Sequence, residues 1–181
     1  MLKKVLVAVA LLLVFLVVAI AAATFLSPTD FRIEREVVIN RPKEEVFAYA
    51  KMLRNQNEWG PWFKKDPSMQ QEFRGEDGKP GFVSYWKSEN ADVGEGEQEI
   101  RNVIDGERID SQLRFKQPFE SNADAYILTE SIGDSQTKVT WGFSTVMPRP
   151  FNLMTLVIDM DAAVGNDFQQ GLDTMKRILE K

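Results

Sequence analysis

The sequence predicts an α+β fold, in which a curved antiparallel sheet of about six to seven strands wraps around a long C-terminal helix. One N-terminal transmembrane helix precedes this sheet. Three observations lead to this prediction. Residues 5–26 form an uninterrupted apolar segment, residues 31–147 contain short strand-like segments separated by turns, and residues 160–179 repeat apolar side chains at helical spacing.

Strand character is clearest at residues 31–40 (FRIEREVVIN), where apolar and charged side chains alternate. Alternation with a period of two is typical of a strand with one buried face. Further strand-like segments follow, each bounded by turn residues, and Asp105-Gly106 is a strong hairpin signal. Sequential strands joined by turns predict an antiparallel meander. The later segments cover residues 68–74, 82–87, 93–104, 107–115, 123–132 and 137–147.

Two regions have helical spacing instead. Pro42 suits the first turn of a helix that continues to about Leu53, and an aromatic turn at residues 58–63 (EWGPWF) follows it. Gly165 and Gly171 lie inside the C-terminal helix, where each costs about 1 kcal/mol relative to Ala, so they predict close packing on the sheet or a bend. One face of this helix carries the apolar residues Met160, Val164, Phe168, Leu172, Met175 and Leu179.

The apolar segment at residues 5–26 has no charge, and Thr24 is its only residue with a polar side chain. As a helix it spans about 33 Å, enough for the ~30 Å hydrocarbon core of a bilayer. Residues 1–4 contain two lysines, which favour a cytoplasmic N-terminus and an exported domain on the periplasmic or extracellular side. Residues 27–30 form a linker, and residues 31–181 form the folded domain.

A cleaved secretory signal is the alternative interpretation of the same segment. Lys3 and Lys4 provide a basic start, and the small residues at 19–23 provide possible cleavage sites. The apolar segment nevertheless continues through Phe25 and Leu26, which favours a retained single-pass anchor. Both interpretations export the domain, and a cleaved signal would make it a secreted protein.

Composition excludes several classes of chemistry. Residues 28–181 hold 20 of the 22 basic residues and all 27 acidic ones, so this part has a net charge of −7 and is a poor partner for nucleic acid. The chain has no Cys and no His, which removes disulfides, thiolates, the commonest general base and the commonest metal ligand. The sequence contains no catalytic motif, no metal-ligand spacing and no phosphate-binding loop, so we expect no catalytic residue, metal or cofactor.

The order of elements and three sequence segments resemble the SRPBCC superfamily. The segments are REVVINRPKEEVFAYAKMLRNQNEWGPWF, TKVTWGFSTVM and DFQQGLDTMKRILE. This superfamily includes START domains, pollen-allergen-like proteins and a bacterial polyketide cyclase/dehydrase group. The resemblance covers about residues 31–181 and implies a START-like helix-grip fold. It also implies a hydrophobic cavity between sheet and long helix that binds a lipid or another hydrophobic small molecule.

Strand alternation predicts which side chains face that cavity. Charged residues at 95, 97, 99 and 101 take the outer face, so Gln98 and Asn102 face inward. A slip of one residue in register would invert this assignment. The same stripe of aromatics could instead be ordinary core packing. The candidate cavity residues are Trp59, Trp62, Trp86, Gln98, Ser111, Leu113, Phe115, Trp141, Phe143, Met160, Val164 and Phe168.

These observations favour a membrane-tethered domain that binds a lipid or other hydrophobic small molecule without catalysis. One alternative is a polyketide cyclase/dehydrase-like enzyme, which would need Asp, Glu, Tyr or Arg in place of His as the general acid or base. Another is a structural or interaction module whose own aromatics fill the space. An ionisable side chain in the cavity would favour the enzyme, and a filled core would favour the structural module.

Overall fold

A computed structural model describes residues 2–157 and 159–181. The chain forms two compact units. The first combines the N-terminal residues up to 31 with residues 146–159, and the second contains residues 32–145 and 160–181.

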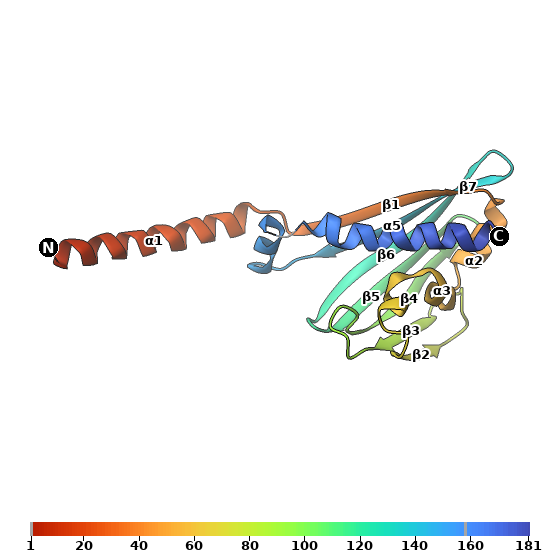
Figure 1. Cartoon of the computed structure of the whole chain (residues 1–181), viewed down its shortest axis with the longest axis horizontal. Helices are drawn as coiled ribbons and strands as arrows, with labels where there is room; N and C mark the ends of the chain where they lie inside the picture. The colour runs from red at the N-terminus through yellow and green to blue at the C-terminus, as the bar shows by residue number, and fades with distance from the viewer. Residues whose placement is uncertain (1, 158) are drawn as a thin grey trace. The chain divides into compact units, whose positions relative to one another are not determined.

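The second unit is built on a seven-stranded antiparallel sheet with the order β1-β7-β6-β5-β4-β3-β2 (Figure 1). Strands β2 to β7 form the predicted meander, and β1 lies beside β7 as an edge strand, so that the first and last strands of the chain are neighbours. The predicted α+β helix-grip fold is confirmed. The strands are β1 (Asp30–Ile39), β2 (Gln70–Arg74), β3 (Val83–Lys87), β4 (Glu95–Ile104), β5 (Arg108–Gln117), β6 (Ser121–Ile132) and β7 (Gln136–Val146).

Helices lie on one face of the sheet. The long helix α5 (Met160–Leu179) packs there through Phe168, which stacks on Trp141 of β7 with 3.9 Å between ring centroids. A series of short helices connects β1 to β2: α2 (Lys43–Ala50), η1 (Leu53–Asn55), α3 (Gln56–Trp59) and α4 (Pro61–Lys65). Helix α2 contacts β6, and α3 and α4 contact α5. Completely or almost completely buried side chains from all these layers form the core, including Ile33, Ile39, Val46, Phe47, Trp59, Phe82, Ile100, Val139, Leu172 and Met175.

A β-bulge in β4 corrects one part of the predicted inner face. Ile100 pairs with Ser111 but Asn102 pairs with Asp110, so Arg101 has no partner residue in β5. The extra residue reverses the alternation beyond it. The prediction that Asn102 faces inward is therefore wrong: its side chain is exposed and donates a hydrogen bond to the Asp110 carboxylate at 3.3 Å.

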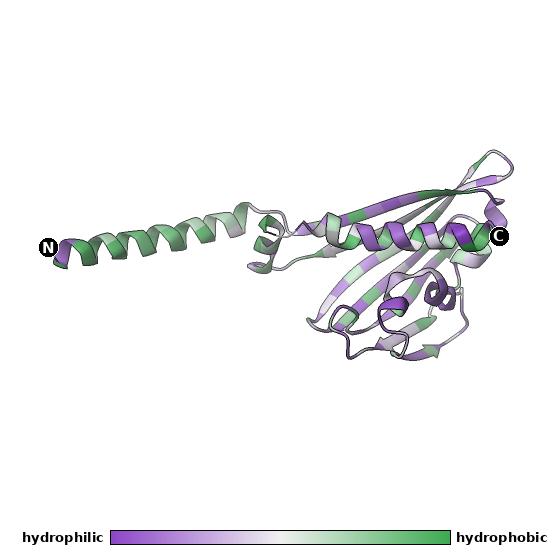
Figure 2. Cartoon of the chain, in the orientation of Figure 1, coloured by the Kyte–Doolittle hydropathy of each residue, from purple (hydrophilic) through white to green (hydrophobic). Residues whose placement is uncertain are grey.

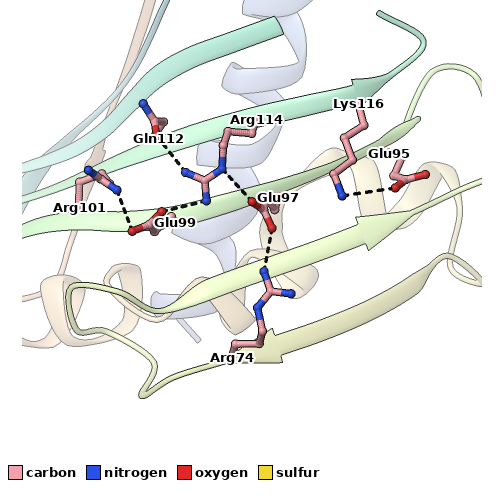
Figure 3. Close-up of polar contacts among 8 residues, drawn as sticks. All are labelled: Arg74, Glu95, Glu97, Glu99, Arg101, Gln112, Arg114 and Lys116. Carbon is pink, nitrogen blue, oxygen red and sulfur yellow. Dashed lines mark hydrogen bonds and ion pairs between the residues drawn. The ribbon is translucent and has the colours of Figure 1, made fainter. Parts of the chain in front are cut away.

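The outer face of β4 and β5 carries a ladder of ion pairs (Figure 3). The guanidinium of Arg114 lies 2.8 Å from carboxylate oxygens of both Glu97 and Glu99, and Arg74 and Arg101 extend the ladder on either side. Hydrogen bonds from Arg114 are the largest influence on both glutamates and hold their pKa values below the ordinary range. The charged side chains of the outer face thus pair with one another, so this face can remain exposed to water without a second layer of structure.

The first unit contains the apolar helix α1 (Leu2–Leu26) and a 3₁₀ helix, η2 (Phe151–Leu156). By length and composition alone, α1 is the single described helix that could cross a membrane. Residues 146–159 lie within the domain expected at residues 31–181, and by their contacts they group with α1. The side chain of Asn152 explains this grouping, because it donates hydrogen bonds to the carbonyls of Thr24 and Ser27 at 2.9 and 3.1 Å.

Replacing Arg114 with Met should lower the free energy of unfolding at neutral pH by about 1–2 kcal/mol, because the two half-buried carboxylates of Glu97 and Glu99 lose the arginine that they share and keep only Arg74 and Arg101. The contribution of Arg114 is present above the pKa of Glu in the unfolded chain, about 4.3, and disappears as the pH falls through the lower folded-state pKa values. Urea unfolding at several pH values should therefore show the difference between variant and wild type vanishing in acid.

The control is Lys79→Met, which breaks an exposed pair with Glu76 and should change the stability by less than about 0.5 kcal/mol. An Arg114→Met deficit that stays constant down to about pH 3 would contradict the proposed role of these two carboxylates.

Candidate functional site

A cavity of about 310 Å³ lies between the inner face of the sheet, the short helices and α5. Strands β2 to β7 supply its floor, α3 and α4 supply one wall, and Val164 and Phe168 of α5 supply another. Its volume lies at the small end of the range for ligand pockets in proteins. The space between sheet and helix is therefore not completely filled by the protein's own side chains.

The floor follows directly from strand register. Gln98 of β4 pairs with Ser84 of β3 on one side and with Leu113 of β5 on the other, and all three line the cavity. Two residues along the strands, and therefore on the same face, Trp86 pairs with Gly96. A Cβ at Gly96 would lie only 2.7 Å from the Trp86 ring and 2.8 Å from a backbone carbonyl, so glycine leaves room for the indole.

Three aromatic rings from different elements form the wall next to α5. Trp141 stacks on Phe168, and Trp62 of α4 packs edge-on against both rings, with centroid distances of 5.7 and 6.1 Å. Gly171 of α5 lies against Trp141, since a Cβ there would approach the ring to 2.9 Å. The glycine predicted to mark close packing of helix on sheet thus does so, and the aromatic cluster fixes the width of the cavity at this end.

Polar contacts hold the short helices over the sheet. The carboxylate of Asp77, in the loop after β2, accepts hydrogen bonds from the backbone N–H groups of Leu53 and Arg54 at 2.8 and 3.1 Å. Lys65 of α4 forms a 2.6 Å ion pair with Asp167 of α5. These contacts set the position of α3 and α4, and hence of Trp62 above the floor.

The polar groups of the lining are mainly neutral. Asn57 of α3 and Gln71 of β2 join their side-chain amides by two reciprocal hydrogen bonds of 2.8 Å. Gln98 and Ser84 line the cavity, and the described residues provide their side chains with no hydrogen-bond partner. Among the described lining residues the one charged side chain is Asp92, which is exposed. Within the described part of the chain no cluster of acidic residues could hold a metal ion.

The mouth of the cavity is formed by exposed lining residues from two turns. Ala91 and Asp92 come from the turn before β4, and Gln117 and Pro118 come from the end of β5. Gly94 brings these turns together, because it adopts a positive φ of 66° and a side chain there would collide with the backbone carbonyl of Gln117.

Most of the candidate residues expected from strand alternation lie around this cavity. Trp59 and Ser111 do not belong to its lining. Trp59 is completely buried behind Trp141 as core, and Ser111 is buried where Ile100 and Ala125 flank it across the sheet. The side chain of Met160 lies outside the described part of the structure. The lining contains Trp62, Trp86, Gln98, Leu113, Phe115, Trp141, Phe143, Val164 and Phe168.

Sequence reasoning missed the amide pair Asn57–Gln71 and the mouth at Asp92 and Pro118. The amide pair joins a short helix to an edge strand, and no sequence periodicity links residues in such different elements. The turn residues around the mouth were recognised as turns, but their proximity depends on the pairing of β4 with β5.

Residues 30–180 match the sequence family described as "Polyketide cyclase / dehydrase and lipid transport". The chain belongs to this family. The match spans β1 to α5 and includes every element that lines the cavity. The family description names both chemistry and transport, so membership supports a fold that holds hydrophobic molecules without selecting one activity.

Solved structures with the same fold belong to proteins of different kinds. Norcoclaurine synthase from Thalictrum flavum is 11% identical, with a TM-score of 0.62, and the match covers 85% of this chain and 96% of that one. The Aha1 dimer from Colwellia psychrerythraea is 14% identical, with a TM-score of 0.57 and coverages of 83% and 96%. Protein CV1439 from Chromobacterium violaceum is 15% identical, with a TM-score of 0.57 and coverages of 84% and 98%. No curated protein sequence matches the chain.

Replacing Phe168 with Ala should lower the free energy of unfolding by about 3–4 kcal/mol, because this buried ring joins α5 to the aromatic cluster and its loss leaves a void. Denaturant unfolding followed by tryptophan fluorescence would measure the loss. Phe119→Ala is the matched control, since that ring is 76% exposed and its removal should cost less than about 0.5 kcal/mol. Equal losses for the two variants would show that Phe168 does not hold the helix on the sheet.

Proposed function

We propose that this family member is a membrane-tethered binding protein, which holds a lipid or other hydrophobic small molecule in the cavity between sheet and α5 without chemical conversion. The observation that carries this proposal is the lining itself: aromatic and aliphatic side chains surround a space of about 310 Å³, and apart from the exposed Asp92 the polar side chains among them are amides and a hydroxyl. Transfer of an apolar molecule from water into such a space is favourable by about 25 cal/mol per Å² of surface buried.

The polar side chains suggest the form of the ligand. Gln98 and Ser84 are neighbours across β3 and β4, so a neutral polar group on the ligand could bond to both. The lining offers no basic side chain among the described residues, and an anionic head would enter the apolar part without a partner. An uncharged molecule with an apolar body and one neutral polar end fits this arrangement best.

Binding without catalysis is favoured over the enzyme alternative by the position of charge. A general acid or base must lie within hydrogen-bond reach of the reacting group. Asp92 is the charged lining residue and lies exposed at the mouth, whereas the inner floor is formed by Gln98, Leu113 and aromatic rings. The structural module is less well supported, because the aromatics do not fill the space that they surround.

The tether is the second part of the proposal. Helix α1 has 25 residues, and apart from Lys3 and Lys4 its side chains are almost all apolar and lie exposed. Exposure of so many large apolar side chains is unfavourable in water and favourable in a bilayer. A retained single-pass helix with a cytoplasmic N-terminus would keep the exported domain beside a store of hydrophobic ligands.

Filling the cavity should abolish ligand uptake. Ala125 of β6 lines the cavity, and Ala125→Phe would place a ring in the free space. We expect this variant to bind the neutral probe N-phenylnaphthylamine at least about tenfold more weakly than the wild type. Binding would be measured by energy transfer from the lining tryptophans to the probe, with the full chain in lipid nanodiscs. Probe that partitions into the lipid gives the same background for all variants, so a difference between variants reports on the cavity.

Asp124→Leu is the control, since Asp124 precedes Ala125 on the same strand but is exposed on the opposite face. It should leave probe binding unchanged. Wild-type protein that takes up no probe, or a folded Ala125→Phe variant that binds as well as the wild type, would count against the proposed binding role.

The tether has a separate test. Replacing both Leu12 and Leu13 with Lys puts two charges at the centre of α1, each costing about 2.5–3.5 kcal/mol in a membrane helix. The variant should be released from membranes by alkaline extraction or fail to be exported, whereas the wild type should stay in the membrane fraction. Mature wild-type protein that starts near Ala22 or Thr24 would instead identify a cleaved signal.

A further inference from the structure

Large exposed apolar side chains continue beyond α1 into residues 147–157, which we call the η2 segment. Phe151, Leu156 and Val157 are 60%, 62% and 83% exposed, and Phe25 and Leu26 at the end of α1 are 72% and 85% exposed. Figure 2 shows the hydrophobic colouring of α1 returning in the short helical turn beside its C-terminal end. Exposed apolar residues gathered in this way usually mark an interaction surface.

The η2 segment is attached to the end of α1 by specific polar contacts. Arg149 donates a hydrogen bond from Nε to the carbonyl of Thr24 at 3.1 Å, and its guanidinium lies 5.4 Å from the centre of the Phe25 ring. Completely buried Asn152 donates through Nδ2 to the carbonyls of Thr24 and Ser27. These donors satisfy carbonyls that a helix C-terminus leaves without partners, and the positive charge suits that end of the helix.

The length of α1 sets the depth of this attachment in a bilayer. With Lys3 and Lys4 in one headgroup layer, the 22 residues from Val5 to Leu26 span about 33 Å and place Leu26 at the opposite edge of the ~30 Å hydrocarbon core. The η2 segment, bonded at Thr24 to Ser27, is then within reach of the interfacial zone, where apolar side chains insert about 5–10 Å.

We propose that the η2 segment is a second membrane contact, which inserts Phe151, Leu156 and Val157 into the interfacial zone of the bilayer that α1 crosses. This inference rests on the tether proposed above. Composition favours lipid over a protein partner: residues 146–158 (VMPRPFNLMTLVI) contain no acidic residue and a single charge, Arg149, whereas residues 28–181 as a whole carry a net charge of −7. Arg149 and Asn152 also donate hydrogen bonds to the backbone carbonyls at the end of α1. Carbonyls without such partners would be unfavourable in a zone that is poor in water.

Single-cysteine labelling tests the inference in the full chain, which has no cysteine of its own. The variants Leu156→Cys and Val157→Cys carry exposed side chains, so a fluorescent nitrobenzoxadiazole label should leave the fold intact. In phosphatidylcholine nanodiscs, lipids brominated near the headgroup should quench both labels by about twofold or more. A label at Asp134→Cys, in an exposed turn of the other unit, should not be quenched.

A third label, at Leu13→Cys within α1, separates this inference from the tether. Because position 13 lies near the centre of the bilayer, its quenching is measured with lipids brominated deep in the acyl chain. Quenching at positions 13, 156 and 157 supports both proposals. Quenching at position 13 alone overturns the second contact and leaves the tether in place, and quenching at none of the three overturns the tether as well. Labels at 156 and 157 that are shielded from aqueous iodide but not quenched by brominated lipid would identify a protein interface, and would also overturn the inference.

Discussion

The alternation of side chains across β4 and β5 is the constraint on which the rest of the domain depends. Gln98 and Leu113 are paired on one face, and Glu97 and Arg114 are paired on the other. Because successive side chains point to opposite faces, a single register sends apolar residues inward and charges outward. The ion-pair ladder of the outer face therefore reinforces the register that builds the cavity floor, although it lies on the other side of the sheet (Figure 3).

The apolar inner face of the sheet must be shielded from water, and the helices that shield it leave a cavity beneath them. Helix α5 covers the part of the sheet near β7, where Phe168 stacks on Trp141 and Gly171 allows close approach. The short helices α3 and α4 cover the part near β2 through the amide pair of Asn57 and Gln71. Phe115 of β5 and Phe143 of β7, whose ring packs edge-on against Phe168, line the cavity. The two parts of the cover are joined to each other by the contact of Trp62 with Phe168 and by the ion pair of Lys65 with Asp167, and the cavity remains between them and the sheet.

The sequence predicted the elements and the inner face well, because both follow from periodicities of 2 and 3.6 residues. Gln98 and Trp141 could be placed on the cavity side from alternation alone. The prediction failed where a local event interrupts the period, as at the bulge that turns Asn102 outward. It also failed to separate Trp59 from Trp62, because the two lie three residues apart in one aromatic turn and only packing distinguishes a buried core ring from a lining ring.

Polar groups in apolar surroundings distinguish the structural from the functional parts of this chain. At the end of α1, the carbonyls of Thr24 and Phe25 are bonded by side chains of the same unit, so the protein supplies the partners itself. In the cavity, Gln98 and Ser84 receive no partner from the described residues, and water or a ligand must provide one. A group that the chain satisfies internally can be explained by stability alone. Amide and hydroxyl groups left open among aromatic rings instead favour a bound molecule that is mostly apolar and polar at one point.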